Sequence, residues 1–296
     1  MKKRYIHIIG VVASALMLLS GCMMLDTMRT DGNIAFKPLI GHDTRAVESV
    51  PFPQDRSFKV WSVNQASGDI YIQGETISHS SEGWVSSKLW TLDQMYFEAH
   101  WPEDLPMTFS KSDGLQLKDF DCSNGDIDIL VAKAYETSED DDVVILNFDH
   151  ILSRVEFRMK HSLPEEMSMR LKKITMIGYA NKGDYNTKVK NGWSEGENDF
   201  SYVVYDSGEA DGVDIFTGEA QYIGEEFYVI PQPCYAALQV DYEVRFGEAT
   251  WVPQTETIES LKTHWEPGKH YTYTVNLTME KLTFTTGISS LNNREE

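Results

Sequence analysis

The chain has 296 residues and a formal net charge of −20, with 46 acidic and 26 basic side chains. Because this length exceeds one typical domain of roughly 100 to 150 residues, we expect two domains with sizeable cores. The acidic balance repels anionic membrane surfaces and the phosphate backbone, which disfavours nucleic acid as a partner. The content of 14 Tyr, 13 Phe and 7 Trp, with Gly and Pro spread along the chain, favours many short β-strands.

The amino terminus has the pattern of an export signal. Basic residues 2–4 precede an apolar stretch from Ile6 to Leu19, which is too short to cross a bilayer of about 30 Å as a helix. The following sequence, Leu19-Ser20-Gly21-Cys22, is similar to a lipobox, in which the cysteine thiol receives the lipid. We therefore expect residues 1–22 to contain a lipoprotein signal peptide and Cys22 to be lipidated. The alternative is an ordinary cleavage site beside a buried cysteine.

Apolar residues then alternate with polar ones at a period of two, which predicts strands along most of the chain. In the first half the predicted strands lie at 34–36, 58–63, 70–72, 84–85, 127–131, 143–148 and 155–157. In the second half they lie at 171–177, 200–205, 227–230, 238–246 and 271–284. This spacing predicts an all-β fold of two tandem sandwiches with Greek-key connections.

The polar segment at 160–166 contains Pro164 and is able to stop a strand, so we place the domain boundary there. The predicted domains are then 23–162 and 163–296. Beyond Cys22 the chain has two cysteines, Cys122 and Cys234. Export to an oxidising compartment permits a disulfide between them, and two separate buried thiols are the alternative.

No motif for catalysis is found. The sequence lacks a G-x-S-x-G elbow, a Walker loop and an H-E-x-x-H helix, and its eight histidines are scattered. Carboxylates alternate from Asp119 to Asp128 as in a calcium loop, but Asn124 and Leu130 occupy positions that an EF-hand reserves for glycine and glutamate. We predict no enzyme activity, no cofactor and no EF-hand. Looser calcium binding by this segment stays an alternative to an ordinary strand entry, and the acidic run at 139–142 is interpreted as a solvated loop.

Tryptophans offer a second functional reading, because an exposed ring presents a flat apolar face to a sugar. Trp61 and Trp90 lie in alternating patterns typical of core strands, whereas Trp101 and Trp193 lie beside proline or glycine in predicted loops. Local packing is the preferred role for the last two as well. A monomeric surface lipoprotein that binds glycans therefore remains the alternative function.

Seven blocks, in order after the lipobox, resemble conserved segments of the fimbrillins of Bacteroidales, which build type V pili. The resemblance covers nearly the whole mature chain. The blocks are the first strand at 34–36 with Asp43-Thr44-Arg45-Ala46, the strand at 58–63, and the segments 95–102, 126–132, 144–157, 227–233 and 265–273.

The resemblance implies tandem transthyretin-like sandwich domains and a lipidated precursor that is carried to the outer membrane. It also implies that a trypsin-like protease cuts between Arg45 and Ala46, in a processing loop at 41–50. Loss of the first strand, at about 33–40, would expose an apolar groove and unpaired backbone groups. A strand of a neighbouring subunit would then fill the groove by β-augmentation, and this head-to-tail contact makes a filament.

We predict the donor at the carboxy terminus, between 271 and 288, because this stretch alternates and is rich in β-branched residues. The expected groove-filling residues are Tyr271, Tyr273, Val275, Leu277, Leu282, Phe284 and Ile288. The expected partners are other pilus subunits and a host or bacterial surface ligand, at the outer membrane and in the fimbrium. The alternative is that Arg45 is an ordinary loop residue and that the terminal strands complete their own sandwich.

Overall fold

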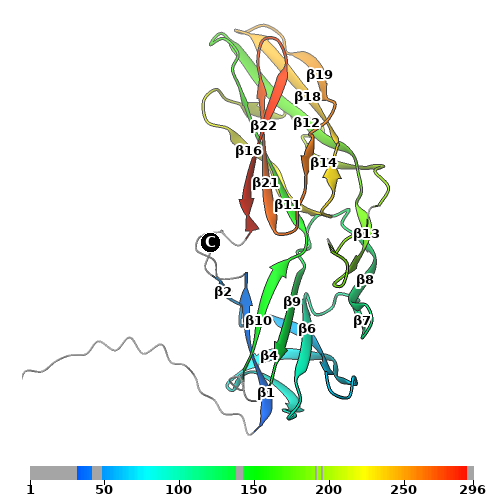
Figure 1. The fold of residues 1–296 in the computed structure, drawn as a ribbon. Helices are drawn as coiled ribbons and strands as arrows, with labels where there is room; N and C mark the ends of the chain where they lie inside the picture. Colours follow the sequence, from blue (N-terminus) through cyan, green and yellow to red (C-terminus); the bar gives the residue numbers. More distant parts are fainter. Residues whose placement is uncertain (1–31, 42–48, 138–142, 191, 195, 292–296) are drawn as a thin grey trace, which may run out of the picture.

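The computed structural model describes residues 32–41, 49–137, 143–190, 192–194 and 196–291. Within these ranges the regular secondary structure consists of β-strands, with no α-helix. The molecule is elongated, with two parts that follow one another along its long axis (Figure 1). A search of the same ranges for a helix long and apolar enough to cross a membrane finds none.

The N-terminal part is one sheet that closes on itself. Its strands are β1 (Asn33–Ile40), β2 (Val50–Pro51), β3 (Ser57–Asn64), β4 (Ile70–Ser80), β5 (Gly83–Leu89), β6 (Met95–Trp101), β9 (Leu130–Glu136) and β10 (Val143–His150). The order is β10-β9-β6-β3-β4-β5-β1, and a parallel pairing of β1 with β10 completes a seven-stranded barrel. The short β2 pairs with β1.

Aromatic rings fill this barrel. Phe36, Phe52, Phe58, Phe97 and Phe148 come from five segments and are all buried, and they pack mostly edge to face at centroid distances between 5.2 and 5.9 Å. Most of the barrel strands contribute alternate residues to the interior, as the period of two requires.

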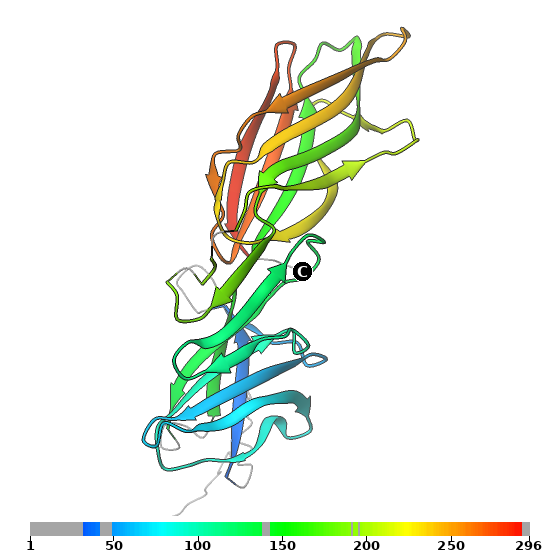
Figure 2. The ribbon, with the colours of Figure 1, turned by 90° about the vertical axis from the view of Figure 1, so that its right-hand side faces the viewer.

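The C-terminal part is a sandwich of two sheets around a second core. One sheet has the order β16-β11-β21-β22 and the other β14-β12-β18-β19, with β15 on β12 (Figure 2). The bounds are β11 (Ser153–His161), β12 (Met167–Tyr179), β14 (Phe200–Asp206), β15 (Val213–Ile215), β16 (Gln221–Val229), β18 (Ala237–Phe246), β19 (Val252–Ile258), β21 (Lys269–Leu277) and β22 (Leu282–Ser290). A short pair, β17 (Pro233–Cys234) with β20 (Thr263–His264), lies beside them.

A third sheet joins the two parts. It has the order β13-β8-β7 and consists of β7 (Thr108–Ser110), β8 (Gly114–Asp121) and β13 (Lys182–Asn186). Because β13 follows β12 whereas β7 and β8 follow β6, this sheet attaches an arm of the C-terminal part to the N-terminal part. A hydrophobic cluster that includes Leu117, Leu152 and Trp193 packs at this junction.

The all-β prediction is confirmed, and the C-terminal part has the expected two facing sheets. The N-terminal part instead closes into a barrel, and its assignment as a transthyretin-like Greek-key sandwich stays a prediction. The chain changes sheets at Ile151–Leu152, between β10 and β11. β11 pairs with β16 and β21, and Pro164 follows its end. The domain boundary after residue 162 stays a prediction.

Candidate assembly site

β1 is the strand that closes the barrel. It lies between β5 and β10, and Ala35 to Ile40 pair in parallel with Val143 to Phe148. Pro38 has no backbone N–H, but its carbonyl oxygen accepts from Phe52 N at 3.2 Å, so its backbone faces the β2 side of the strand. The proline therefore removes no donor from the ladder between β1 and β10.

The interior face of β1 is apolar. Ile34 and Pro38 are buried, and Phe36 is 5% exposed, with its ring 5.9 Å from those of Phe58 and Phe97. Full burial of a side chain of this size contributes roughly 1.5 to 3 kcal/mol. Loss of β1 would therefore open a groove along β10 with strong affinity for another alternating strand.

The end of β1 nearer the junction leads towards the predicted processing site. Gly41 N donates to Phe148 O at 2.8 Å, and Ile40 pairs with Val50 of β2. The segment 42–48 connects these two points and includes Arg45 and Ala46, which lie outside the described residues, as does Cys22. Cleavage in this segment would cut the covalent link between β1 and the rest of the barrel.

The seven predicted donor residues lie in one hairpin of the C-terminal part but in two different environments. Tyr271, Tyr273, Val275 and Leu277 are buried on β21, which is flanked by β11 and β22. Their polar atoms are also bound, since Tyr271 OH donates to His264 O at 2.6 Å and Trp265 Nε1 donates to Tyr273 OH at 3.0 Å. These four residues complete the core of their own domain.

β22 is the edge strand of the same sheet, and among the described strands it pairs with β21 alone. Leu282 is buried, Phe284 is half-buried and Ile288 is 60% exposed. An edge strand with unpaired backbone groups and exposed alternate side chains is a template for pairing with another chain. Of the predicted segment, β22 can leave without breaking the ladder between β11 and β21.

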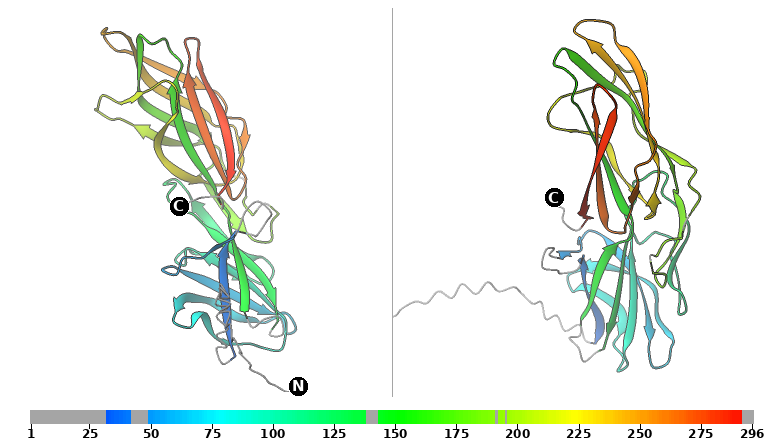
Figure 3. Two further views of the ribbon diagram at one scale, coloured as in Figure 1. Left: turned by 90° about the vertical axis from the view of Figure 1, so that its left-hand side faces the viewer. Right: turned by 45° about the horizontal axis from the view of Figure 1, so that its top comes forward.

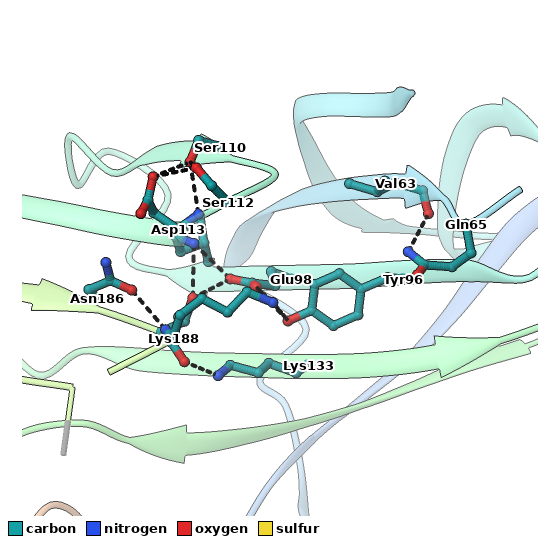
Figure 4. Close-up of polar contacts among 12 residues, drawn as sticks. Val63, Gln65, Tyr96, Glu98, Ser110, Ser112, Asp113, Lys133, Asn186 and Lys188 are labelled. Carbon is teal, nitrogen blue, oxygen red and sulfur yellow. Dashed lines mark hydrogen bonds and ion pairs between the residues drawn. The ribbon is translucent and has the colours of Figure 1, made fainter. Parts of the chain in front are cut away.

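Glu98 forms a buried polar contact between the two parts that the sequence analysis did not find (Figure 4). Its fully buried carboxylate accepts hydrogen bonds from Tyr96 OH at 2.5 Å and from Leu115 N and Thr187 Oγ1, both at 2.7 Å. Burial and the bond to Glu98 raise the pKa of Tyr96. Since Thr187 directly follows β13, Glu98 binds the arm of the C-terminal part to β6 and β8. The only sequence signal was a charged residue inside an apolar strand.

Gly114 makes this close approach possible. It has a φ of +69°, and a Cβ atom there would lie 2.2 Å from Thr187 Oγ1 and 2.6 Å from Glu98 Oε1. Only glycine combines this backbone conformation with the available space.

Two groups of residues are candidates for binding a metal ion, one from the sequence and one from the structure. The carboxylates at 119–128 form no three-ligand group within the described ranges, and Asp121 Oδ1 accepts from Ser123 N and Asn181 Nδ2 instead. A group that does form is Glu156, Glu226 and His270, whose ligand atoms lie within 4.8 Å of one another. Its two carboxylates already form ion pairs, Glu226 with Arg154 and Glu156 with Arg158. These ion pairs explain why the two carboxylates lie close together without a metal ion.

The tryptophans considered as sugar platforms are mostly covered. Trp61 and Trp193 are each 7% exposed, and Trp193 Nε1 donates to Ile151 O at 2.7 Å. Trp101 is half-buried beneath the guanidinium of Arg56, 4.7 Å from its ring centroid. Trp90 packs against the barrel core. These four rings do not form an exposed row.

Cys122 and Cys234 are free, buried thiols that belong to different hydrophobic clusters. Burial raises the pKa of Cys122 to about 11 and that of Cys234 to about 12. Because the thiolate is the reactive form, we expect neither thiol of residues 23–296 to react with Ellman's reagent at pH 8 until guanidinium unfolds the chain. A Thr285→Cys variant, with its thiol at an exposed position, provides the control for rapid labelling. Rapid labelling of the native unsubstituted chain would contradict this burial.

Comparison with known proteins agrees with this architecture. Residues 44–290 match the family model described as fimbrillin-like. A fimbrial protein from Bacteroides vulgatus has a similar fold, with 14% identity, a TM-score of 0.61, and coverage of 86% of this chain and 99% of that one. Two candidate cell adhesion proteins, from Bacteroides uniformis and Bacteroides ovatus, each have 16% identity. Their TM-scores are 0.56 and 0.54, and the matches cover 88% and 87% of this chain and 100% and 97% of theirs.

The search of curated proteins gave no match. At these identities the solved structures establish a common fold, while the family model matches most of the chain. The family and its fimbrial neighbours support a pilus-type subunit of a cell-surface appendage and suggest a non-enzymatic role. The resemblance found in the sequence is thus confirmed, and the chain belongs to the fimbrillin-like family.

Proposed function

We propose that this chain is a structural subunit of a type V pilus that polymerises by donor-strand exchange and contributes to adhesion. In this proposal Cys22 carries the lipid that anchors the precursor to the outer membrane, and a protease cuts between Arg45 and Ala46. β1 then leaves, and β22 of a second copy takes its place. The observation that carries the proposal is the position of β1. In the described part of the chain it is the strand that joins β5 to β10, and the segment 42–48 connects it to β2.

Exchange improves the environment of β22. In its own domain β22 has one neighbouring strand and exposes Ile288. In the groove it would pair with both β5 and β10 and bury that side chain. The gain in burial and in backbone pairing offsets the loss of the ladder with β21, and the release of the cleaved strand makes the step irreversible in practice.

The direction of β22 also favours this strand as the one that replaces β1. β22 begins beside the turn 278–281, at the end of the C-terminal part distant from the junction, and runs back towards the junction (Figure 3). If it detaches and extends from this turn, it points away from its own subunit. It then enters the groove of the next subunit from the end where β1 begins and runs in the direction of β1, parallel to β10.

The side-chain pattern gives a register. The inward positions of β1 are Ile34, Phe36, Pro38 and Ile40, and the matching positions of β22 are Leu282, Phe284, Thr286 and Ile288. Phe284 then occupies the site of Phe36, and branched aliphatic residues occupy both ends. In strands a slip by one residue would turn all of these side chains outward, so this register is strongly favoured.

The test uses residues 23–296 and an arginine-specific protease. We expect cleavage that leaves Ala46 as the new amino terminus, followed by ladders of multimers that persist in SDS, because strand-exchanged contacts unfold slowly. The Arg45→Ala variant should remain uncut at this position and should migrate as a monomer in SDS, with Arg56→Ala as the matched control that still forms ladders. If the chain is cut after Arg45 but stays monomeric, polymerisation by strand exchange is wrong for this subunit.

A further inference from the structure

The end of the C-terminal part distant from the junction contains a cavity of about 490 Å³. It lies where β11 ends, β12 begins and β18 ends, beside the segment that follows β15. Its apolar lining comes from Leu163, Met167, Met169, Ile215, Phe216 and Trp251. Other large apolar side chains lie exposed at this end, including Phe246 and Met279, while Phe216 is itself 60% exposed. We call this lined cavity the socket.

One cation of the socket has unused hydrogen-bonding capacity. The guanidinium of Arg245 lies 4.6 Å from the ring centroid of Trp251, whose ring also contacts Arg170 at 4.5 Å. Whereas Arg170 pairs with Glu243, Arg245 Nε is buried with no hydrogen-bond partner in the described part of the chain. Glu165 and Asp214 also line the socket and are exposed to solvent. The apolar lining therefore suits an apolar side chain, and a carboxylate beside it is favoured only next to Arg245, since Glu165 and Asp214 repel it elsewhere.

The opposite end of the molecule presents such a pair. Leu92, in the connection between β5 and β6, is 95% exposed, and Asp93 follows it. The connection is held in place because Asn64 Nδ2 donates to Asp93 Oδ2 at 2.9 Å and Trp90 N donates to Gly32 O at 2.7 Å. Leu92 is thus an apolar knob on an anchored turn, beside the start of β1.

We propose that Leu92 of one subunit inserts into the socket of a second copy and that Asp93 pairs with Arg245 there. Knob and socket lie at opposite ends of an elongated chain, so the contact is heterologous and repeats without closing. The turn 278–281, from which β22 would extend, lies at the socket end, and the start of β1 lies at the knob end. End-to-end docking would therefore bring the donor strand to the entrance of its groove.

This inference deepens the proposed function and rests on it for its role in assembly, but the contact itself does not require strand exchange. Uncut residues 23–296, in which β1 still fills the groove, should associate end to end with a dissociation constant on the order of 0.1 mM. Sedimentation equilibrium measures this association. Leu92→Glu should weaken it at least about tenfold, by placing an unpaired charge in an apolar socket, whereas Val189→Glu, at an exposed residue of the junction arm, should not change it.

Charge reversal tests the paired residues. Arg245→Glu or Asp93→Lys alone should weaken association of the uncut chain about fivefold or more, and the double variant should restore it, since reversal preserves the pair. The proposal is overturned if uncut chains do not associate, or if Leu92→Glu and Val189→Glu behave alike. If association depends on Leu92 but the cut chain forms no ladders, the knob and socket are retained and strand exchange fails.

Discussion

Replacing Phe284 by aspartate is expected to abolish the SDS-resistant ladder while the cleaved chain remains a folded monomer. In the proposed register this side chain enters the site of Phe36, between the rings of Phe58 and Phe97. A carboxylate there has no partner, and burying it without one costs at least several kcal/mol. A penalty of that size lowers the extent of polymerisation by more than about a thousandfold. Denaturing gels of the cut chain provide the measurement.

The neighbouring residue provides the matched control. Thr285→Asp adds the same charge one position along β22, where the side chain is exposed both in its own sheet and at the matching position of Lys37. Its ladder should equal that of the unsubstituted chain. Thermal melting of the uncut variants checks that the half-buried Phe284 is not essential to its own domain. If both variants form ladders equally well, β22 is not the donor in this register.

Removing the carboxylate of Glu98 is expected to cause the largest loss of stability from a single polar substitution. Glu98→Ala leaves Leu115 N and Thr187 Oγ1 buried without this acceptor and opens a cavity at the junction. Loss of one partner from a buried charged network lowers the free energy of unfolding by about 3 to 5 kcal/mol. Because the arm of the C-terminal part is then released, denaturant unfolding should separate into two transitions.

Two control variants give reference values for this loss in the free energy of unfolding. Glu98→Gln retains the shape and one acceptor oxygen, so we expect a smaller loss than for alanine. Glu82→Ala removes an exposed carboxylate and should change the free energy of unfolding by less than about 0.5 kcal/mol. An unfolding curve for Glu98→Ala that overlays that of Glu82→Ala would contradict the role of Glu98 as the contact between the two parts.

The strands were predictable because each needs only a local pattern, but their partners were not. The alternation in 58–63 and 143–148 predicts β3 and β10, yet nothing local indicates that β10 pairs with β1, more than 100 residues earlier. Such long-range pairing is set by the closure of the whole barrel. The pairing of β11 with β16 and β21 is long-range in the same way, and the polar segment at 160–166 carries no local signal of it.

The candidate site was found only in part by the sequence. Residues 271–277 and 282–288 both alternate, so the sequence predicts β21 and β22 as one donor unit. Burial separates them, because β21 has strands on both sides and β22 has one. Glu98 and the arm that carries Thr187 were missed, since a buried carboxylate is identified by partners that are distant in sequence. The role of Arg45 stays a prediction from the family resemblance.

The proposed register is tested most directly by an intermolecular disulfide. In the uncut chain Lys37 of β1 pairs with Ile145 of β10, and both side chains are exposed. The register places Thr285 of the donor at the position of Lys37, where a parallel neighbour is within disulfide distance. A chain with both Thr285→Cys and Ile145→Cys should, after cleavage and mild oxidation, give ladders that survive boiling and collapse on reduction. Ladders in which these two thiols remain unlinked would contradict insertion of β22 between β5 and β10.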